Sequence, residues 1–364
     1  MHKLHSGFYH DVNNPESFGF AKNQVRPFNI TTPDGETLYA WHVLPLDVYA
    51  EHSDALRKAR DASSIQLDLL RNDPAAKVVI NCPYPPLLLP HSKQLICPVH
   101  GNAGHVAQGW RTDTYRSLVS QPHTHVLTID YRGFGLSTGS PTEAGLVTDG
   151  VALANWVLQT AGIPPSRIVV LGQSLGTAVA TAVGLHFASL GSGEVSDLLP
   201  AAVDAVAEKS AKAIAFAGIV LVAPFTSLPD LLLSYRIGGV LPVLSPLKPY
   251  PYLQALVSAR IVDQWPTARR LVAYVAALGQ HEDVLAGERE SRDVGSVQIL
   301  HAVNDGDISY HQGEMLFASV FTAGIGGGEA EKEIASGRRV KSWKVDGSPR
   351  VGLEILEHGG ELFF

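Results

Sequence analysis

The sequence predicts an α/β fold, in which a mostly parallel sheet carries helices on both faces. Short runs rich in β-branched residues alternate with longer helix-like segments, and such alternation is typical of parallel strands joined by crossover helices. One of these runs, Ile168–Leu171, leads directly into Gly172-Gln173-Ser174-Leu175-Gly176 and then into a helix-like segment of small residues. A G-x-S-x-G between a strand and a helix indicates a nucleophile elbow, a sharp turn that lifts the serine hydroxyl above the sheet.

Composition limits the classes of protein that fit the chain. Of its 364 residues, 45% are hydrophobic, which is enough for a large core. The net charge is −7 and no run of Lys or Arg stands out, so we expect no nucleic-acid partner. The cysteines are Cys82 and Cys97, which give neither a disulfide framework nor metal-ligand spacing, and we expect no metal and no cofactor. No stretch has the length and apolarity of a membrane span or a signal peptide, so the sequence as written predicts a soluble protein.

The first part of the chain predicts an extension followed by a hairpin. Residues 1–25 are polar and aromatic and are expected to form an N-terminal extension to a domain spanning 26–364. Two alternating runs, Arg26–Thr31 and Thr37–Leu44, flank Pro33-Asp34-Gly35-Glu36. Because Asp-Gly between alternating runs is a turn signal, we expect an antiparallel hairpin at one edge of the sheet.

The remaining elements alternate, with two interruptions. Strands are expected at 77–81, 125–131, 168–171, 219–223, 297–301 and 353–356, and helices at 51–70, 143–160, 177–183 and 312–322. Prolines are too dense in residues 83–98 for a central strand, so we interpret this segment as an insertion. Residues 226–293, rich in Leu, Tyr and Pro, predict a helical lid over the carboxyl ends of the strands, where such sheets bind ligands. Ordinary helical packing is the alternative for this segment.

A nucleophilic serine needs a base beside it and an acid that orients the base. After Ser174, the next carboxylates that follow a predicted strand are Asp305 and Asp307. We favour Asp305 as the acid, because a tight turn directly after the strand would hold it at the carboxyl edge of the sheet. Asp307 is the alternative, and a turn capped by aspartate without any catalytic role would look similar in sequence.

Several motifs occur in an order that resembles one family. They are His100–Gly104, Asp130–Gly135, Gly172–Gly176, Ala223–Thr226 and His301–Asp305. Together they resemble the lipid serine hydrolases of the α/β-hydrolase superfamily, a branch that contains monoacylglycerol and lysophospholipid lipases and protein depalmitoylases. The resemblance implies an α/β-hydrolase fold with roughly eight strands, Ser174 as nucleophile and Asp305 as acid. It also implies an oxyanion hole formed by the backbone N–H groups of Asn102 and Leu175.

The catalytic base is expected on the loop after the last strand. The family places a histidine there, usually after glycine, but in this chain Glu361 stands at the corresponding position. His358 is the histidine nearest to that loop, and we therefore predict it as the base. The competing interpretation is a chain that stops before its true base and before the closing helix of the fold.

The resemblance implies an enzyme that cleaves lipid esters, such as monoacylglycerols or lysophospholipids, through an acyl-enzyme on Ser174. A protein acyl-thioesterase that removes acyl groups from cysteines is an alternative within the same branch. A catalytically impaired form that only binds ligands is a second alternative, and it would agree with a doubtful base. Peripheral contact with a membrane through the lid or the N-terminal segment also stays open.

Overall fold

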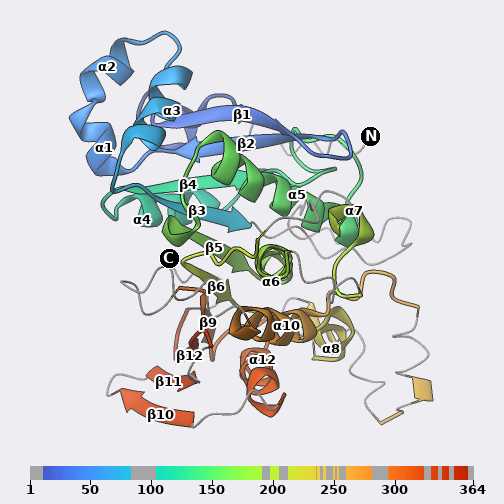
Figure 1. Cartoon of the computed structure of the whole chain (residues 1–364). Coiled ribbons are helices and arrows are strands. Elements are labelled where there is room, and N and C mark those ends of the chain that lie inside the picture. Colours follow the sequence, from blue (N-terminus) through green and yellow to red (C-terminus); the bar gives the residue numbers. More distant parts are fainter. Residues whose placement is uncertain are drawn as a thin grey trace.

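The chain is built around a ten-stranded sheet, shown in the computed structural model of Figure 1. The structure describes residues 11–82, 104–190, 197–204, 212–234, 236–237, 241–242, 249–250, 252–253, 260–280, 294–323, 329–334, 338–343 and 348–359. The strand order is β1-β2-β4-β3-β5-β6-β9-β12-β11-β10. Strands β4, β3, β5, β6, β9 and β12 are parallel, and the strands on either side of them pair antiparallel. This mostly parallel sheet, with helices on both faces, confirms the predicted fold class.

The strands of the sheet are β1 (Val25–Thr31), β2 (Thr37–Val43), β3 (Lys77–Cys82), β4 (Thr124–Ile129), β5 (Ile168–Gln173), β6 (Gly218–Val222), β9 (Ser296–Ala302), β10 (Glu329–Ile334), β11 (Arg338–Trp343) and β12 (Val351–Leu356). The helices are α1 (Leu46–Glu51), α2 (Ser53–Lys58), α3 (Ser63–Asn72), α4 (Arg111–Val119), α5 (Glu143–Asn155), α6 (Leu175–Ala188), α7 (Ala201–Asp204), α8 (Leu228–Ser234), α10 (Thr267–Gln280) and α12 (His311–Thr322). Short 3₁₀ turns lie at Pro15–Phe18 and Pro165–Arg167, a π-helical turn at Trp156–Thr160 continues α5, and β7 (Arg236–Ile237) pairs with β8 (Leu241–Pro242).

The predicted N-terminal hairpin is confirmed as β1 and β2, which pair antiparallel from Val25 opposite Val43 to Thr31 opposite Thr37. Successive side chains of a strand point to opposite faces, so β2 contributes to two separate layers of core. Trp41 packs with residues of one layer and Ala40 with residues of the other. The hairpin therefore closes one edge of the sheet and contributes side chains to the core on both faces.

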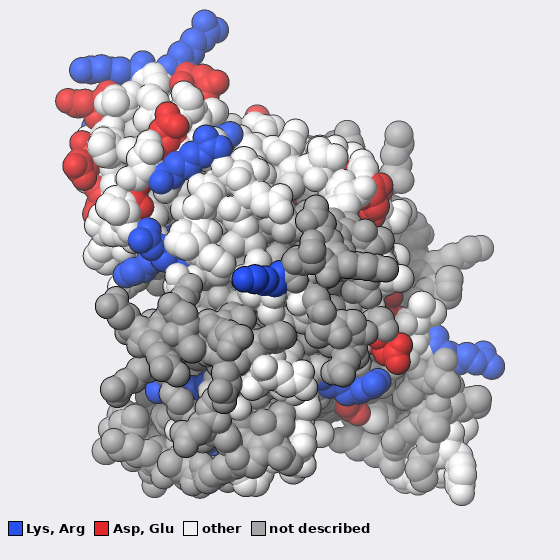
Figure 2. Space-filling view, viewed as in Figure 1, with Lys and Arg blue, Asp and Glu red and all other residues white. Residues whose placement is uncertain are grey.

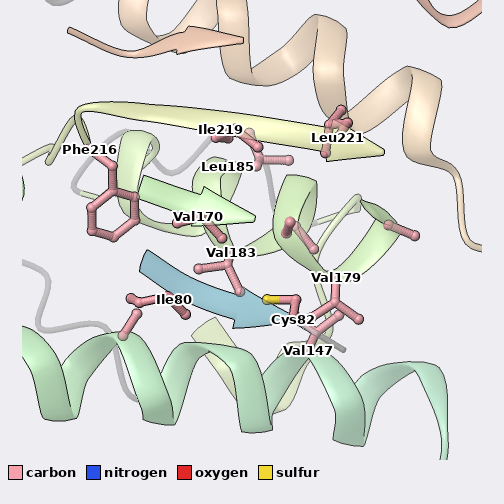
Figure 3. Packing of buried hydrophobic residues seen from close by; sticks show 14 of the residues in the cluster. Ile80, Cys82, Val147, Val170, Val179, Val183, Leu185, Phe216, Ile219 and Leu221 are labelled. Atoms are coloured by element: carbon pink, nitrogen blue, oxygen red, sulfur yellow. The ribbon is translucent and has the colours of Figure 1, made fainter. Parts of the chain in front are cut away.

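Helices α5, α6, α10 and α12 lie side by side on one face of the sheet (Figure 1). Figure 3 shows the core beneath them, where Val170 and Ile219 from the sheet meet Val183 and Leu185 from α6. Helices α5 and α6 approach closely at Gly150, since a Cβ there would press against side chains of α6. Helix α4 and the segment after residue 11 cover the other face, around Tyr115.

The structure differs from the predictions at three places. Strands β10 and β11 extend the sheet beyond β12 and were not predicted, because short charged strands at an edge lack the apolar pattern of buried ones. The helix expected at 51–70 is two helices, α2 and α3, separated by a break. Helix α10, which falls inside the predicted lid of 226–293, packs against α6 and α12 in the layer that covers the sheet. Its amphipathic stripe is thus part of the scaffold.

The other domain predictions concern segments of which the structure describes only part. Residues 11–24 of the predicted extension pack on the sheet: the backbone oxygen of Val12 accepts hydrogen bonds from Tyr39 Oη at 2.8 Å and Trp41 Nε1 at 3.2 Å. The suspected insertion, 83–98, and much of the predicted lid between α8 and α10 lie outside the described residues. The insertion and the lid therefore stay predictions.

The charged surface in Figure 2 gathers over α1, α2 and α3, with both signs intermingled. On this face of the molecule, the described part of the surface carries no large area of one charge. Within the described ranges, none of the helices has both the length and the apolarity needed to cross a bilayer.

Candidate active site

Ser174 occupies a strained turn between β5 and α6. Its φ of 50° and ψ of −121° place a non-glycine residue in a sparsely populated region, which costs energy and is typical of functional turns. Its N–H donates to the Val222 carbonyl at 2.9 Å, and its own carbonyl accepts from Thr177 N at 2.9 Å. A Cβ at Gly172 would overlap the Gly176 carbonyl oxygen, so only glycine lets strand and helix approach this closely. The G-x-S-x-G stretch therefore folds as the predicted elbow.

The surroundings of Ser174 favour negative charge. Leu175 begins α6, and its N–H therefore has no carbonyl four residues earlier within the helix. The N-terminus of α6 also carries the positive end of the helix dipole. Among the described residues, no hydrogen bond involves the Ser174 hydroxyl. The second predicted oxyanion donor, Asn102, lies outside the described residues.

The order of the strands brings the predicted site loops to one edge of the sheet. Strands β5, β6, β9 and β12 are neighbours and run parallel, so the loops that leave their carboxyl ends emerge on the same side. Ser174 follows β5, Asp305 follows β9 and His358 follows β12. β3 precedes the glycine-rich segment containing Asn102. It pairs with β5 on the side away from β6, and there Cys82 lies opposite Gly172.

Asp305 has the surroundings of an oriented carboxylate. Its side chain is only 1% exposed. Oδ1 accepts hydrogen bonds from the backbone N–H groups of Asp307, at 3.0 Å, and Ile308, at 2.9 Å. Oδ2 is buried and accepts no hydrogen bond from any described residue. A buried oxygen without a hydrogen-bond donor is rare, because burial removes its hydration. Asp305 Oδ2 could therefore accept a hydrogen bond from a histidine N–H.

Asp307, the alternative acid, is half-buried and lies two residues further along the same turn. Burial raises the pKa of its carboxyl group, and the negative charge of Asp305 raises it further. Its N–H is used to orient Asp305, whereas no described hydrogen bond orients its own carboxylate. The geometry therefore favours Asp305.

His358 lies on the loop after β12, as predicted, but its side chain is exposed. No described residue forms a hydrogen bond or an ion pair with its ring, so the structure does not bring it to Asp305 or Ser174. The same loop is nevertheless tied to the loop of the acid, because Gly359 N donates to Asn304 Oδ1 at 2.9 Å. His358 therefore stays a prediction: its loop contacts the loop of the acid, but its side chain has no contact there among the described residues.

Asp130, at the end of β4, is a site-proximal residue to which the motif analysis gave no role. Its buried carboxylate accepts from Val106 N at 2.5 Å and from Leu136 N at 3.1 Å. It thus joins the segment after His100–Gly104 to the loop after β4. Burial raises the pKa of Asp130 to about 7, although both backbone donors and the cation of Arg111 oppose that shift. Sequence showed only an aspartate at a strand end, and one of its two partners, Val106, lies 24 residues away along the chain.

Arg132, two residues later, holds the same loop to the hairpin and to α5. Its guanidinium contacts the carboxylate of Asp149, which is fully buried, at 2.8 Å and that of Asp34 at 2.7 Å. Its backbone N–H also donates to Asp149 Oδ2 at 2.8 Å. The Arg132 hydrogen bond lowers the pKa of Asp34 to about 2. This ion-pair network explains why the Asp-Tyr-Arg-Gly segment keeps a fixed course beside the site.

No group of three or more His, Cys, Asp or Glu side chains suited to a metal ion occurs in the part of the chain that the structure describes. Cys82 is buried and free. Cys97 lies outside the described residues.

Comparison with known proteins identifies the family. The model of the alpha/beta hydrolase family matches residues 99–320, which is more than half of the chain and includes Ser174 and Asp305. The chain belongs to the alpha/beta hydrolase family. This confirms the resemblance inferred from the motifs and the predicted fold.

Curated relatives are similar over parts of the chain. A protein of Danio rerio named lysophosphatidylserine lipase ABHD12 is 30% identical over 174 residues, which are 48% of this chain and 38% of that protein. Human protein ABHD12B is 46% identical over 87 residues, 24% of this chain and 23% of its own length. The chain therefore spans well under half the length of the curated relatives it matches. Among solved structures, an alpha-beta hydrolase from Vibrio vulnificus is 15% identical, with a TM-score of 0.49, over 87% of this chain and 77% of that one.

Proposed function

We propose that the protein is a serine hydrolase that cleaves carboxylic esters through an acyl-enzyme. The observation that carries the proposal is the strained Ser174 at the start of α6, at the same sheet edge as a buried carboxylate, Asp305, with one oxygen free of described donors. In this proposal Ser174 attacks the ester carbonyl, and the N–H of Leu175 stabilises the oxyanion together with that of Asn102. Asp305 orients the base, for which His358 is the candidate.

The proposed substrate is a lipid monoester of the lysophospholipid or monoacylglycerol class. Support comes from the motifs that resemble lipid hydrolases and from the relatives named lysophosphatidylserine lipase. Ester hydrolysis by this route releases the alcohol head group first, and water then releases the fatty acid from Ser174.

Labelling with a fluorophosphonate tests the proposal, because this probe reacts only with an activated serine. We expect labelling of the wild-type chain, none of Ser174→Ala, and about 10⁴-fold slower labelling of Asp305→Asn, by analogy with the loss of a triad acid. Hydrolysis of lysophosphatidylserine, monoacylglycerol and a palmitoylated cysteine peptide would then compare the lipid and thioester substrates. A folded wild-type chain that is not labelled would overturn the proposal.

The position of His358 favours a second candidate, a form of the fold that binds ligands without turning them over. Its exposed ring has no described partner, whereas a working base must reach both the serine and the acid. Labelling of the wild-type chain separates the two, because the binding form should not be labelled. If the wild type is labelled, His358→Ala, compared with His311→Ala as a second exposed histidine, tests whether His358 is the base. Labelling lost only in His358→Ala makes His358 the base, and equal labelling of both variants places the base elsewhere.

A further inference from the structure

His301, near the end of β9, is a buried histidine directly beneath the loop that carries Asp305. Its side chain is 0% exposed, and Nε2 lies 2.9 Å from the backbone oxygen of Ile308. A carbonyl oxygen only accepts hydrogen bonds, so Nε2 carries the proton and donates. The ring thereby fixes the far end of the tight turn that begins after β9.

Ile308 is held from both sides. Its N–H donates to Asp305 Oδ1 at 2.9 Å, while its carbonyl accepts from His301. The same Nε2 is 3.6 Å from Asp305 Oδ2, too far for a hydrogen bond, so His301 is linked to Asp305 through Ile308 and not directly. A closed arrangement of His301, Ile308 and Asp305 therefore sets the orientation of the carboxylate.

Helix α12 leaves room for the ring. A Cβ at Gly313 would lie 3.0 Å from His301 Nδ1, so even alanine at this position would require the imidazole to shift by a few tenths of an ångström. His301 cannot itself serve as the base in this arrangement, because Nε2 is engaged and the ring is shut off from solvent. Among the described residues, His301 thus lies beside the acid and holds the turn that carries it.

We propose that His301 is a positioning residue, which holds the Ile308 carbonyl and through it fixes the orientation in which Asp305 receives the catalytic base. This rests on the proposed function, in which Asp305 is the acid. A misaligned Asp305 would stabilise the protonated base less well, so losing His301 should affect kcat and the apparent pKa of the base more than KM.

The test compares His301→Leu with His301→Gln, whose amide N–H can replace the Nε2 donor. For His301→Leu we expect kcat to fall about tenfold with KM within about twofold, and the acidic limb of the kcat/KM profile to move, as for the loss of one oriented hydrogen bond. His301→Gln should restore both readouts. His186→Leu is the matched control, because His186 is another buried histidine, on α6, and has no contact with this loop among the described hydrogen bonds.

An Asp305→Asn background shows whether His301 acts through the acid. If it does, adding His301→Leu to Asp305→Asn causes little further loss of kcat. A wild-type pH profile in folded His301→Leu, or an undiminished effect in the Asp305→Asn background, overturns the positioning role alone. A wild-type chain without activity that depends on Ser174 overturns the proposed function and the positioning role with it.

Discussion

Replacing Asp130 by asparagine should change how the stability of the protein depends on pH. The carboxyl group of Asp130 has its pKa raised from 3.8 to about 7 in the folded chain, chiefly by burial. Between these values the folded state holds the proton and the unfolded state does not. Stability contributed by this group is therefore greatest at low pH and is lost as pH rises toward 7. An asparagine at this position has no such proton and should remove this dependence.

The expected size follows from the pKa difference. Each pKa unit corresponds to about 1.4 kcal/mol, and the window from pH 5 to pH 8 covers about two units of it, so the wild-type chain should lose about 3 kcal/mol of unfolding free energy through Asp130. Relative to the wild type, Asp130→Asn should therefore gain about 3 kcal/mol between pH 5 and pH 8. The sign holds even if the variant is less stable at pH 5, where it loses an acceptor.

Urea unfolding followed by tryptophan fluorescence at pH 5, 6, 7 and 8 measures this difference. Asp54→Asn is the matched control, because it removes the same charge from an exposed position on α2. If Asp130→Asn and Asp54→Asn both run parallel to the wild type across this range, the carboxylate of Asp130 is not held at a raised pKa and the reasoning from its burial fails. The same Asp130→Asn variant should lose activity at pH 8, because it replaces one of the acceptors that join the loops at Val106 and Leu136.

Three further outcomes are expected. Gly172→Ala should lose fluorophosphonate labelling and at least about 2 kcal/mol of stability, because its Cβ meets a backbone carbonyl, whereas Gly306→Ala, where a Cβ meets nothing within 4 Å, should leave both unchanged. Asp149→Asn should cost about 1.5–3 kcal/mol in urea unfolding, since it removes the charge from one of the two carboxylates that the Arg132 guanidinium contacts while Asp34 stays in place, and a loss below about 0.5 kcal/mol would contradict this. Burial lowers the pKa of His125 to about 4, so the unfolded chain takes up a proton first and the contribution of His125 to stability should fall by about 3 kcal/mol as pH drops from 6.5 to 4. Relative to the wild type, His125→Gln should therefore gain stability over this range in thermal melts.

The sequence predicted those parts of the fold whose residues interact locally or repeat at a fixed period. The elbow at Ser174 was predictable because its glycines, strand and helix are contiguous, and the β1–β2 hairpin because Asp34-Gly35 marks its turn. Strands β10 and β11 were not, since their sequences are rich in charged residues and lack the apolar alternation that indicates a half-buried strand. Helix α10 fell inside the predicted lid because the Leu, Tyr and Pro content of residues 226–293 indicates apolar character, but not against which partner the helix packs.

The candidate site divides in the same way. Asp305 could be proposed from its place after a strand, but its two N–H donors and its free Oδ2 become visible only once the turn is folded. Asp130 and His301 form hydrogen bonds with backbone groups, and every residue has such groups, so the residue types in the sequence do not reveal these partners. Sequence therefore located the groups that would react with substrate better than the groups that orient them.

Asp305 Oδ2 is buried without a described donor, and an acceptor in that state loses stability that a histidine N–H would restore. The catalytic base, wherever it lies in the chain, should therefore be coupled to Asp305. Replacing the base by alanine in the Asp305→Asn variant should slow labelling little beyond the effect of Asp305→Asn alone. If His358→Ala and Asp305→Asn instead slow labelling by independent factors, His358 does not donate to Oδ2. The loop after β12 would then hold Asn304 through Gly359 without supplying the base.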